Sequence, residues 1–463
     1  MDLIYNIKDK PKFSELVAFS FQQLLAIMAA TIAVPAVVGN GMTASAALFG
    51  AGVGTFVYQL FTKFRSPVFL GSSFAFIGAM CAAFAGASSM SLGYLGLIIG
   101  AVFAGFVYVV LAIAVKASGV QWINKLMPAV VIGPTVAIIG LSLAGNAVSD
   151  MLKGDVTIDG VSASPNVALL CGLVTLFVVI ICSVFGNKKA RLVPFIIGIV
   201  SGYAVALVFT LIGKAANNPS LQIIDFAPFA ALFADGVSLK TFFTFPEFTF
   251  LTAMKGVGEL NAAYVGAVAA AYVPVAFVVF AEHIADHKNL STIINKDLLT
   301  DPGLSCTLLG DGIGSMAGAF FGGCPNTTYG ESVGCVAITR NASVVTISGA
   351  AVLSILVAFI SPLVAFLDSI PSCVMGGVCL TLYGFIAVSG LKMVQEVDLN
   401  DNRNLFVVSA ILIAGIGGLT VTFGQVTITS VACALILGIL VNVLVHHKDL
   451  PEEQKQEPQQ VIK

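Results

Sequence analysis

The chain has 463 residues, of which 58% are hydrophobic and only 10% are charged, and its mean hydropathy of +0.99 is far above that of soluble domains. This composition indicates a polytopic membrane protein, leaves no room for a separate catalytic domain and gives no support to nucleic-acid binding. The formal net charge of −2 says nothing about partners, because in such a chain the positions of the charges matter more than their sum.

Apolar runs that could cross a bilayer follow one another along almost the whole chain. A spanning helix needs about 20 mostly apolar residues. The N-terminal stretch "MDLIYNIKDKPKFSE" carries charges of both signs and has no cleavage site after the first apolar run, so it is expected to be a cytoplasmic tail and not a signal peptide. The runs predict fourteen spans, at residues 15–38, 45–62, 68–87, 91–115, 124–149, 164–186, 192–213, 264–286, 303–322, 325–339, 343–367, 371–391, 404–422 and 424–446.

The Lys and Arg residues lie mainly on one face of this predicted topology. Cytoplasmic loops collect basic residues, and an even number of spans places both termini on the same side, so both termini are expected in the cytoplasm. Only Lys153, Lys214, Lys240 and Lys255 fall on the opposite face. The basic residues on the cytoplasmic face, besides those of the two tails, are Lys63, Arg65, Lys116, Lys125, Lys188, Lys189, Arg191, Lys288, Lys296, Arg340, Lys392 and Arg403.

The longest connection, at about 214–262, divides the spans into two sets of seven. An odd number of spans in each half means that the halves have opposite orientations, and inverted repeats of this kind are common in secondary transporters. The predicted fold is therefore an all-α polytopic membrane protein with 14 spans in two inverted 7-span repeats.

Two segments in corresponding positions do not look like membrane helices. The third span opens with "FLGSSFAFIG" at 69–78 and the tenth opens with "CPNTTYGESVG" at 324–334, and both are short, polar and β-prone. Non-helical backbone is tolerated at membrane depth only when it is buried in protein or lines a cavity. We expect each to be a short extended strand that leads into a half-helix, so that the free N–H groups of the two half-helices converge on one central site.

Ionisable residues cluster at the end of the eighth span, in "VVFAEHIADHKNL" at 278–290. Helical spacing places Glu282 and Asp286 on one face and His283 with His287 on an adjacent face. A carboxylate inside a span is costly and marks a substrate, ion or proton pathway. The structural alternatives are neutralisation of Glu282 by a neighbouring helix, and solvated helix-end positions for Asp286 and His287.

Glu331 follows Gly330 in the broken tenth span, so both residues are expected in the central site. Phe74 and Tyr329 are either walls of this site or ordinary packing residues, and Asp311 and Glu15 are expected to be structural or interfacial. Two carboxylates accept N–H groups and free backbone N–H groups donate to carbonyl oxygens. A planar cyclic amide with alternating N–H and C=O groups, such as a nucleobase, satisfies both.

The sequence gives no sign of a metal, a cofactor or an enzyme. The nine cysteines are scattered singly, without a Cys-x-x-Cys pair or a His cluster, and are expected to be small buried residues. Glu282 and His283 lack the His-Glu-x-x-His metal motif, and Gly-x-Ser-x-Gly is absent.

Several motifs in order resemble the nucleobase–ascorbate transporter (nucleobase:cation symporter) family and, within it, the bacterial uracil permeases. The resemblance covers nearly the whole chain. The motifs are "LGSSFAF" at 70–76, "AEH" at 281–283, "KDLL" with "DPGL" at 296–304, "PNTTYGE" at 325–331, "GCVAITR" at 334–340, and "VMGGV" with "LYG" at 374–384.

The resemblance implies a core domain and a gate domain that move against each other, and dimers formed through the gate. It also implies a proton-coupled symporter of the cytoplasmic membrane whose substrate is uracil, bound by the backbone N–H groups of Phe74 and Gly330 and by the carboxylates of Glu282 and Glu331. The implied boundaries are 1–122 and 263–369 for the core, 123–262 and 370–447 for the gate, and 448–463 for a cytoplasmic tail.

The chain departs from the family pattern at three places. The family's Gln-His pair in the first span is Gln22-Gln23 here, its Glu-Asn in the tenth span is Glu331-Ser332, and its histidine one turn after Glu282 is Asp286. The first two leave the binding prediction intact, and the third leaves the proton route open.

Two alternative substrates keep the same architecture. One is a purine such as xanthine or urate, although purine members of the family usually have glutamine at the position of Glu331. The other is an anion, as in the related sulfate permeases, but Glu282 and Glu331 would repel it.

For the proton, the residue types favour a route along the eighth span. We expect Glu282, Asp286 and Glu331 to take part in proton coupling, with Asp286 relaying the proton inward from Glu282. His287, on a different face of the helix, is the rival relay.

Overall fold

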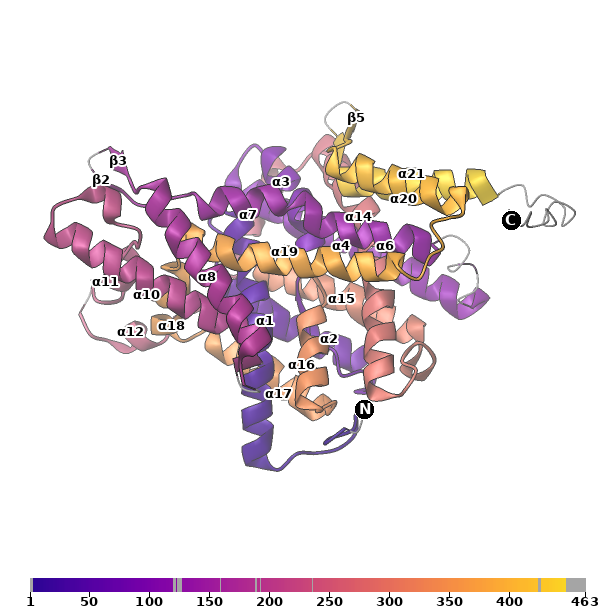
Figure 1. The fold of residues 1–463 in the computed structure, drawn as a ribbon, viewed down its shortest axis with the longest axis horizontal. Coiled ribbons are helices and arrows are strands. Elements are labelled where there is room, and N and C mark those ends of the chain that lie inside the picture. Colours follow the sequence, from indigo (N-terminus) through magenta and orange to yellow (C-terminus); the bar gives the residue numbers. More distant parts are fainter. Residues whose placement is uncertain are drawn as a thin grey trace, which may run out of the picture.

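The computed structural model describes residues 3–119, 122, 127–158, 160–187, 190–191, 193–234, 236–423 and 426–446. The predicted tail at 448–463 lies outside these residues, as do Lys125, Lys188 and Lys189 of the charge argument. Helices dominate the described chain, and the prediction of an all-helical membrane protein is confirmed (Figure 1).

Nine helical stretches in the described ranges are long and apolar enough to cross a membrane. Each coincides with one of the predicted apolar segments. They are α1 (Phe13–Val38), α2 (Ala44–Phe61), α4 (Met90–Ser118), α6 with α7 (Ala129–Ser142, Ala144–Met151), α8 (Pro165–Phe185), α10 (Pro194–Ala215), α14 (Ala262–Ile294), η4 with α15 (Leu299–Gly303, Leu304–Gly322) and α19 (Ser372–Val394).

The other five predicted segments contain shorter helices. Two of these helices, α3 and α16, are short because each follows a strand that takes up the first part of its segment. The shorter helices are α3 (Ile77–Ala85), α16 (Gly330–Thr339), α17 (Val344–Val357) with α18 (Ser361–Asp368), α20 (Asn402–Ile416) and α21 (Ser430–His446).

The two predicted extended segments pair with each other. Strand β1 (Leu70–Ser72) lies antiparallel to β4 (Asn326–Thr328), with Leu70 opposite Thr328 and Ser72 opposite Asn326. All six residues are buried. The short helix η1 (Phe74–Phe76) and then α3 follow β1, whereas α16 follows β4. Because the strands are antiparallel, the starts of η1 and α16 lie at opposite ends of the pair, and they stay close only because each strand has three residues.

A close approach between these segments requires Gly71. A Cβ atom at this position would lie 2.3 Å from the ring of Tyr329. Tyr329 in turn donates its hydroxyl to the backbone oxygen of Ser72 at 2.7 Å. The tyrosine therefore links the end of β4 to β1.

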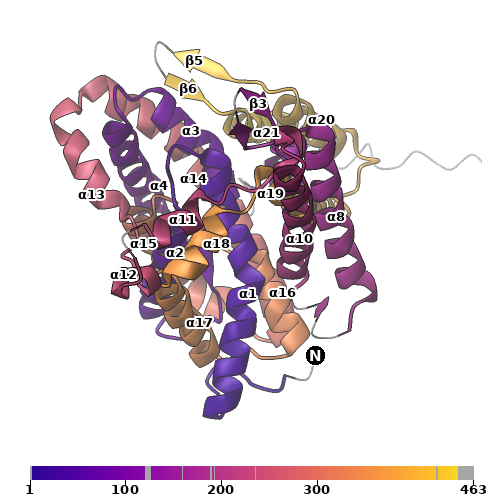
Figure 2. The same cartoon turned by 90° about the vertical axis from the view of Figure 1, so that its left-hand side faces the viewer.

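The helices pack in two groups. In one group, α15 packs against α2 and α4, α17 packs against α1 and α2, and α14 packs against α4. In the other, α19 packs against α6, α7 and α8, α10 against α8, and α20 against α6 and α21. Figure 2 shows α2, α4 and α15 on one side of the molecule and α8, α10 and α20 on the other, with α1 and α14 between them. Helices α1 and α14 contact both groups, since α1 also touches α10 and α19 and α14 also touches α6 and α21.

Helix α14 is longer than the sequence predicted. The side chain of Asn261 caps its start by accepting the N–H of Tyr264 at 2.9 Å, and the helix ends at Asn295, whose φ of 52° is left-handed. The predicted span ended at 286, but the helix continues for about two more turns. Asp286 and His287 are therefore not at a solvated helix end, and that alternative is wrong for His287, which is 0% exposed.

The connection between the two halves folds into short helices. The backbone N–H of Thr244 donates to the oxygen of Phe359 at 3.0 Å, and the ring of Phe248 packs edge-on against Phe49 of α2. The connection is thus held against the first helix group. Its elements are η2 (Pro219–Leu221), α11 (Ala227–Leu232), α12 (Leu239–Phe242), α13 (Thr249–Ala253) and η3 (Met254–Glu259), and the remaining strands are the hairpins β2–β3 (Thr157–Ile158, Val161–Ser162) and β5–β6 (Val421–Phe423, Val426–Ile428).

Candidate functional site

A cavity of about 580 Å³ lies between the two helix groups. From the first group it is lined by residues of α1, η1, β4, α14 and α16, and from the second by residues of α6, α8, α10 and α19. Its volume suits a small-molecule site. All the predicted site residues line it: Phe74, Glu282, Asp286, Gly330 and Glu331.

The start of α16 forms one wall of this cavity. Tyr329 precedes the helix, Gly330 is its first residue and Glu331 its second. The first N–H groups of a helix have no intrahelical partner and carry the positive end of the helix dipole. The wall therefore combines N–H donors with a carboxylate acceptor.

Gly330 is exposed to the cavity, and a Cβ atom there would meet no protein atom within 4 Å. Its backbone φ angle is not positive. Neither a conformation reserved for glycine nor close helix packing therefore explains a glycine at this position. What remains is space for a ligand beside the backbone.

Phe74 lies on the opposite side of the strand pair, at the start of η1. Its ring is 7% exposed and packs edge-on against Tyr383 of α19, with ring centroids 5.4 Å apart. Tyr329 also lines the cavity, while its hydroxyl is used by Ser72. Phe74 thus joins the first helix group to the second at the cavity.

Glu282 and Asp286 share the cavity-facing side of α14, as their helical spacing predicted. Asp286 Oδ2 accepts a hydrogen bond of 2.7 Å from the hydroxyl of Thr328 in β4. Within the described chain, neither Glu282 nor Glu331 accepts a hydrogen bond from another residue's side chain. No neighbouring helix neutralises Glu282 with a basic side chain there, so two carboxylates face the cavity without a described side-chain donor.

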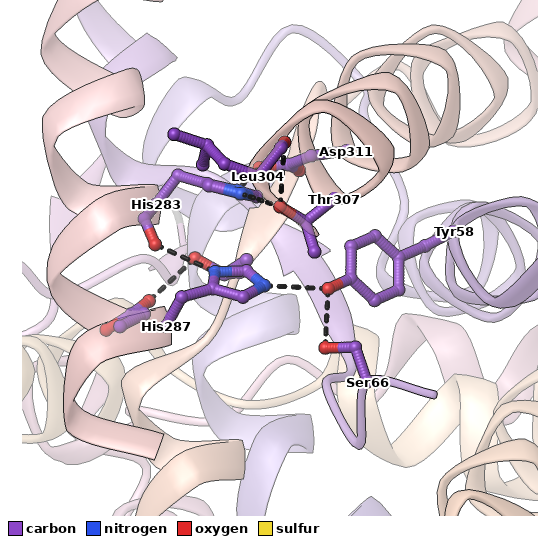
Figure 3. Close-up of polar contacts among 9 residues, drawn as sticks. Tyr58, Ser66, His283, His287, Leu304, Thr307 and Asp311 are labelled. Carbon is purple, nitrogen blue, oxygen red and sulfur yellow. Dashed lines mark hydrogen bonds and ion pairs between the residues drawn. The ribbon is translucent and has the colours of Figure 1, made fainter. Parts of the chain in front are cut away.

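The adjacent face of α14 carries a buried polar network (Figure 3). His283 Nδ1 lies 2.6 Å from Asp311 Oδ2, and its Nε2 lies 3.0 Å from the hydroxyl of Thr307. Thr307 donates its own proton to the backbone oxygen of Leu304 at 3.0 Å, so His283 Nε2–H must be the donor to Thr307. His283 and Asp311 are 0% and 1% exposed, and neither lines the cavity.

His287 extends the same network (Figure 3). Its Nδ1–H donates to the backbone oxygen of His283 at 2.8 Å, and its Nε2 lies 2.8 Å from the hydroxyl of Tyr58. That hydroxyl also bonds Ser66 at 2.7 Å. The two imidazole rings stack with centroids 4.0 Å apart. Both histidines are thus engaged inside the protein and neither lines the cavity.

Two of the departures from the family pattern touch each other. Gln23 of α1 donates through Nε2 to the hydroxyl of Ser332 at 2.5 Å, and the backbone N–H of Phe69 donates to the same hydroxyl at 3.3 Å. Ser332 follows Glu331 directly and is 0% exposed. One hydroxyl therefore connects α1, the segment before β1 and α16 behind the site.

Sequence reasoning missed several cavity residues. Gly334 and Ile338 follow Gly330 at intervals of four, so helical spacing could have found them. The cavity residues of the second helix group could not be found from nearby motifs, because they lie far from the other site residues in sequence. They are Val136, Ser183, Arg191, Pro194, Phe195, Phe385, Ile386 and Ser389. Among the described residues, no group of three His, Cys, Asp or Glu side chains could hold a metal ion.

Comparisons with solved structures identify the architecture. The chain is similar to the transmembrane domain of the cyanobacterium bicarbonate transporter BicA, with a TM-score of 0.60, 14% identity and coverage of 95% of this chain and 99% of that one. It is also similar to murine Solute Carrier 26 family member A9, an anion transporter in the inward-facing state, with a TM-score of 0.63, 12% identity and coverage of 95% and 69%. At these identities the likeness shows the fold alone.

Comparisons of sequence identify the family. The chain is 37% identical over 445 residues to a uracil permease of Bacillus caldolyticus, covering 95% of this chain and 94% of that protein. It is 33% identical over 438 residues to a uracil permease of Escherichia coli (strain K12), covering 94% and 92%. A family model described as "Permease family" (Xan_ur_permease) matches residues 14–424. The chain therefore belongs to this permease family, and it is a multi-pass membrane transporter and not an enzyme.

Proposed function

We propose that the chain carries uracil into the cell together with a proton. The observation that carries this proposal is the pair of carboxylates, Glu282 and Glu331, which face one cavity beside the start of α16 and have no described side-chain donor. The relatives that are 33–37% identical over nearly the whole chain are named uracil permeases, which supports the choice of substrate.

The site matches the functional groups of a pyrimidine base. Glu282 and Glu331 accept its N–H groups, and the backbone N–H groups of Phe74 and Gly330 donate to its carbonyl oxygens. The edge-on contact of Phe74 with Tyr383 gives the cavity an aromatic wall beside these groups.

The charges in the same cavity support proton coupling. Glu282, Asp286 and Glu331 all line it, and Arg191 is the only basic residue among the described residues of its lining. Carboxylates that share one cavity repel one another, and a bound proton relieves this repulsion. In this proposal Glu282 takes up a proton with the substrate, and Asp286 passes it inward.

Transport occurs by movement of a core domain against a gate domain around this site. We assign residues 1–122 and 263–369 to the core and residues 123–262 and 370–447 to the gate, with fourteen spans in two inverted repeats. The separate packing of the two helix groups supports this division, as does the position of the cavity between them. The likeness to two transporters of known structure supports the architecture.

The cavity is open toward the cytoplasm in this proposal, and both termini lie on that side of the cell membrane. Arg191, Asn289 and Ile338 line the cavity, and they lie close in sequence to basic residues that the charge distribution assigns to the cytoplasm. In this proposal two copies associate through the gate domain, and gate surface outside that contact faces lipid. Large apolar side chains exposed on α8 support either contact, among them Phe177, Ile181 and Phe185.

Uptake measurements test the substrate and the coupling together. Cells that lack their own uracil and xanthine permeases should gain uptake of labelled uracil when they express this chain, and an uncoupler should abolish its accumulation. Unlabelled uracil should compete in excess, and xanthine should compete much less.

The rival substrates give different results in the same assay. Uptake of labelled xanthine but not uracil would assign the chain to the purine transporters. Uptake of bicarbonate or sulfate without uracil uptake would place it with the anion transporters that share its fold, and would mean that the cavity carboxylates do not face the substrate.

A further inference from the structure

Thr328 connects the substrate site to the predicted proton relay. It is the last residue of β4, two residues before Gly330, and its backbone pairs with Leu70 of β1. Its side chain is 1% exposed, and its hydroxyl donates to Asp286 Oδ2 of α14 at 2.7 Å. The two residues are 42 positions apart in sequence, so only the tertiary structure joins them.

A hydroxyl donor distinguishes between the two forms of a carboxyl group. An ionised carboxylate only accepts hydrogen bonds, whereas a protonated carboxyl also has an O–H to donate. A hydrogen bond to a charged group is stronger than one to its neutral form. The Thr328 hydroxyl therefore favours the form of Asp286 that has released its proton.

The groups around Asp286 act in the opposite direction. Glu282 lies one turn away on the same helix, Glu331 faces the same cavity from α16, and Asp311 of α15 contacts His283 on the adjacent face of α14. These carboxylates repel a further negative charge. Arg191 of the second helix group lines the same cavity but donates to the backbone oxygen of Val184. Thr328 is the one described residue whose side chain donates a hydrogen bond to Asp286.

We propose that Thr328 is a positioning residue that sets the proton affinity of Asp286 and thereby links proton release to the strand that carries the substrate site. When Asp286 is ionised, the hydrogen bond holds the end of β4 to α14 beside Gly330 and Glu331. When Asp286 is protonated, this bond weakens and β4 is released from α14. This inference rests on the proposed role of Asp286 in proton coupling.

The test uses the full-length protein in reconstituted vesicles. Labelled uracil uptake driven by a fixed pH difference is measured while the internal pH is varied, and uracil counterflow is measured in parallel. Thr328→Val keeps the shape of the side chain but removes the donor. Thr328→Ser restores the donor without the methyl group. Thr135→Val is the matched control, because Thr135 is likewise buried, at 0% exposed, but its hydroxyl donates to the carbonyl oxygen of Val131 in its own helix.

Without the donor, Asp286 holds its proton until the internal pH is higher. Thr328→Val should therefore move the internal pH of half-maximal driven uptake upward by about one unit, which is a tenfold change in proton affinity. The ratio of driven uptake to counterflow should fall at neutral pH and recover at higher internal pH. Thr328→Ser and Thr135→Val should match the wild type. In an Asp286→Asn background, Thr328→Val should cause no further shift.

Each other outcome overturns the inference. An unshifted profile for Thr328→Val would show that the hydroxyl does not act on the proton. Equal damage from Val and Ser would show that Thr328 only packs the strand. If Thr328→Val is too unstable to purify, Thr328→Cys, with a similar size and a weak donor, must give an upward shift instead.

The proposed function can fail separately. If wild-type vesicles bind uracil but their uptake does not respond to the pH difference, both proton coupling and the role of Thr328 are removed. If wild-type uptake is driven by the pH difference but the profile of Thr328→Val is unshifted, only the role of Thr328 is removed.

Discussion

Two adjacent faces of helix α14 each carry two ionisable side chains, and the surroundings of the two faces differ. On one face, Glu282 and Asp286 look into the cavity, and Glu282 accepts no hydrogen bond from another described side chain. On the other, His283 and His287 are 0% exposed and bonded to Asp311, Thr307 and Tyr58. Buried polar groups in a stable interior find partners. Groups that face a cavity without partners are available to a ligand, so the contrast separates residues that act on the substrate from residues that hold the fold.

The largest expected effect lies on the bonded face. Asp311→Ala leaves the Nδ1 of His283 without its partner, and breaking a buried pair costs about 3–5 kcal/mol. Thermal unfolding of the purified protein in detergent should show a much lower midpoint. Glu331→Gln, on the cavity, should leave the midpoint unchanged. Equal midpoints for Asp311→Ala and the wild type would mean that the network does not stabilise the fold.

The next largest effect is expected for Glu331 on the cavity side, where transport is lost but stability is kept. Glu331→Gln can turn an amide donor toward a substrate N–H, and an unmatched buried group costs about 1–3 kcal/mol, or roughly tenfold to a hundredfold in affinity. Uracil uptake should be lost or strongly reduced while the protein remains folded in the membrane. Near-normal uptake by a well-expressed variant would remove Glu331 from the binding site.

Gly330→Val tests the cavity side at a residue that has no side chain. A Cβ atom at Gly330 meets no protein atom within 4 Å, so the added side chain enters only the space that the ligand needs. We expect a loss of uracil binding, on the order of tenfold or more, with an unchanged unfolding midpoint.

The control for Gly330 is a glycine in a packed helix. At Gly312 a Cβ atom would lie 2.6 Å from Cβ of Tyr108. Gly312→Ala should therefore lower the unfolding midpoint. Full uracil binding by Gly330→Val would show that the ligand does not approach this part of the backbone.

Substitutions of the neighbouring residues Asp286 and His287 compare the cavity-facing side of α14 with its buried side. Asp286→Asn should reduce pH-driven uracil uptake more than counterflow, because exchange needs binding and movement but no net proton delivery. His287→Gln should keep the ratio of the two activities and lower the unfolding midpoint, since His287 bonds Tyr58 and the backbone of His283. Full driven uptake by Asp286→Asn would remove Asp286 from the relay, and loss of driven uptake in His287→Gln alone would assign the relay to the histidine.

The smallest effect is expected at the edge of the network. Tyr58→Phe removes the hydroxyl shared by Ser66 and His287, at a cost of about 1 kcal/mol. The midpoint should fall slightly, and the pH dependence of uptake should stay that of the wild type. A changed pH dependence would mean that the buried network exchanges protons with the transport cycle.

Local pattern alone predicted the class of protein, the positions of the helices and five of the residues that line the cavity. Apolar runs depend only on composition, the breaks at "LGSSFAF" and "PNTTYGE" have polar and β-prone residues, and helical spacing places Glu282 and Asp286 on one face. The end of α14 was predicted too early, because the polar residues after 286 look like the end of a span, but the helix continues and buries His287, Leu290 and Ile294.

Only the tertiary structure decided which polar residues receive partners. The pairing of β1 with β4, the contact of Gln23 with Ser332 and the hydrogen bond from Thr328 to Asp286 join residues 42 to 309 positions apart. The residues of α6, α8, α10 and α19 that close the cavity likewise come from the other helix group. Hydrophobic periodicity reports which face of a helix is buried, but it contains no information about which distant side chain will stand opposite, because that depends on how whole helices pack.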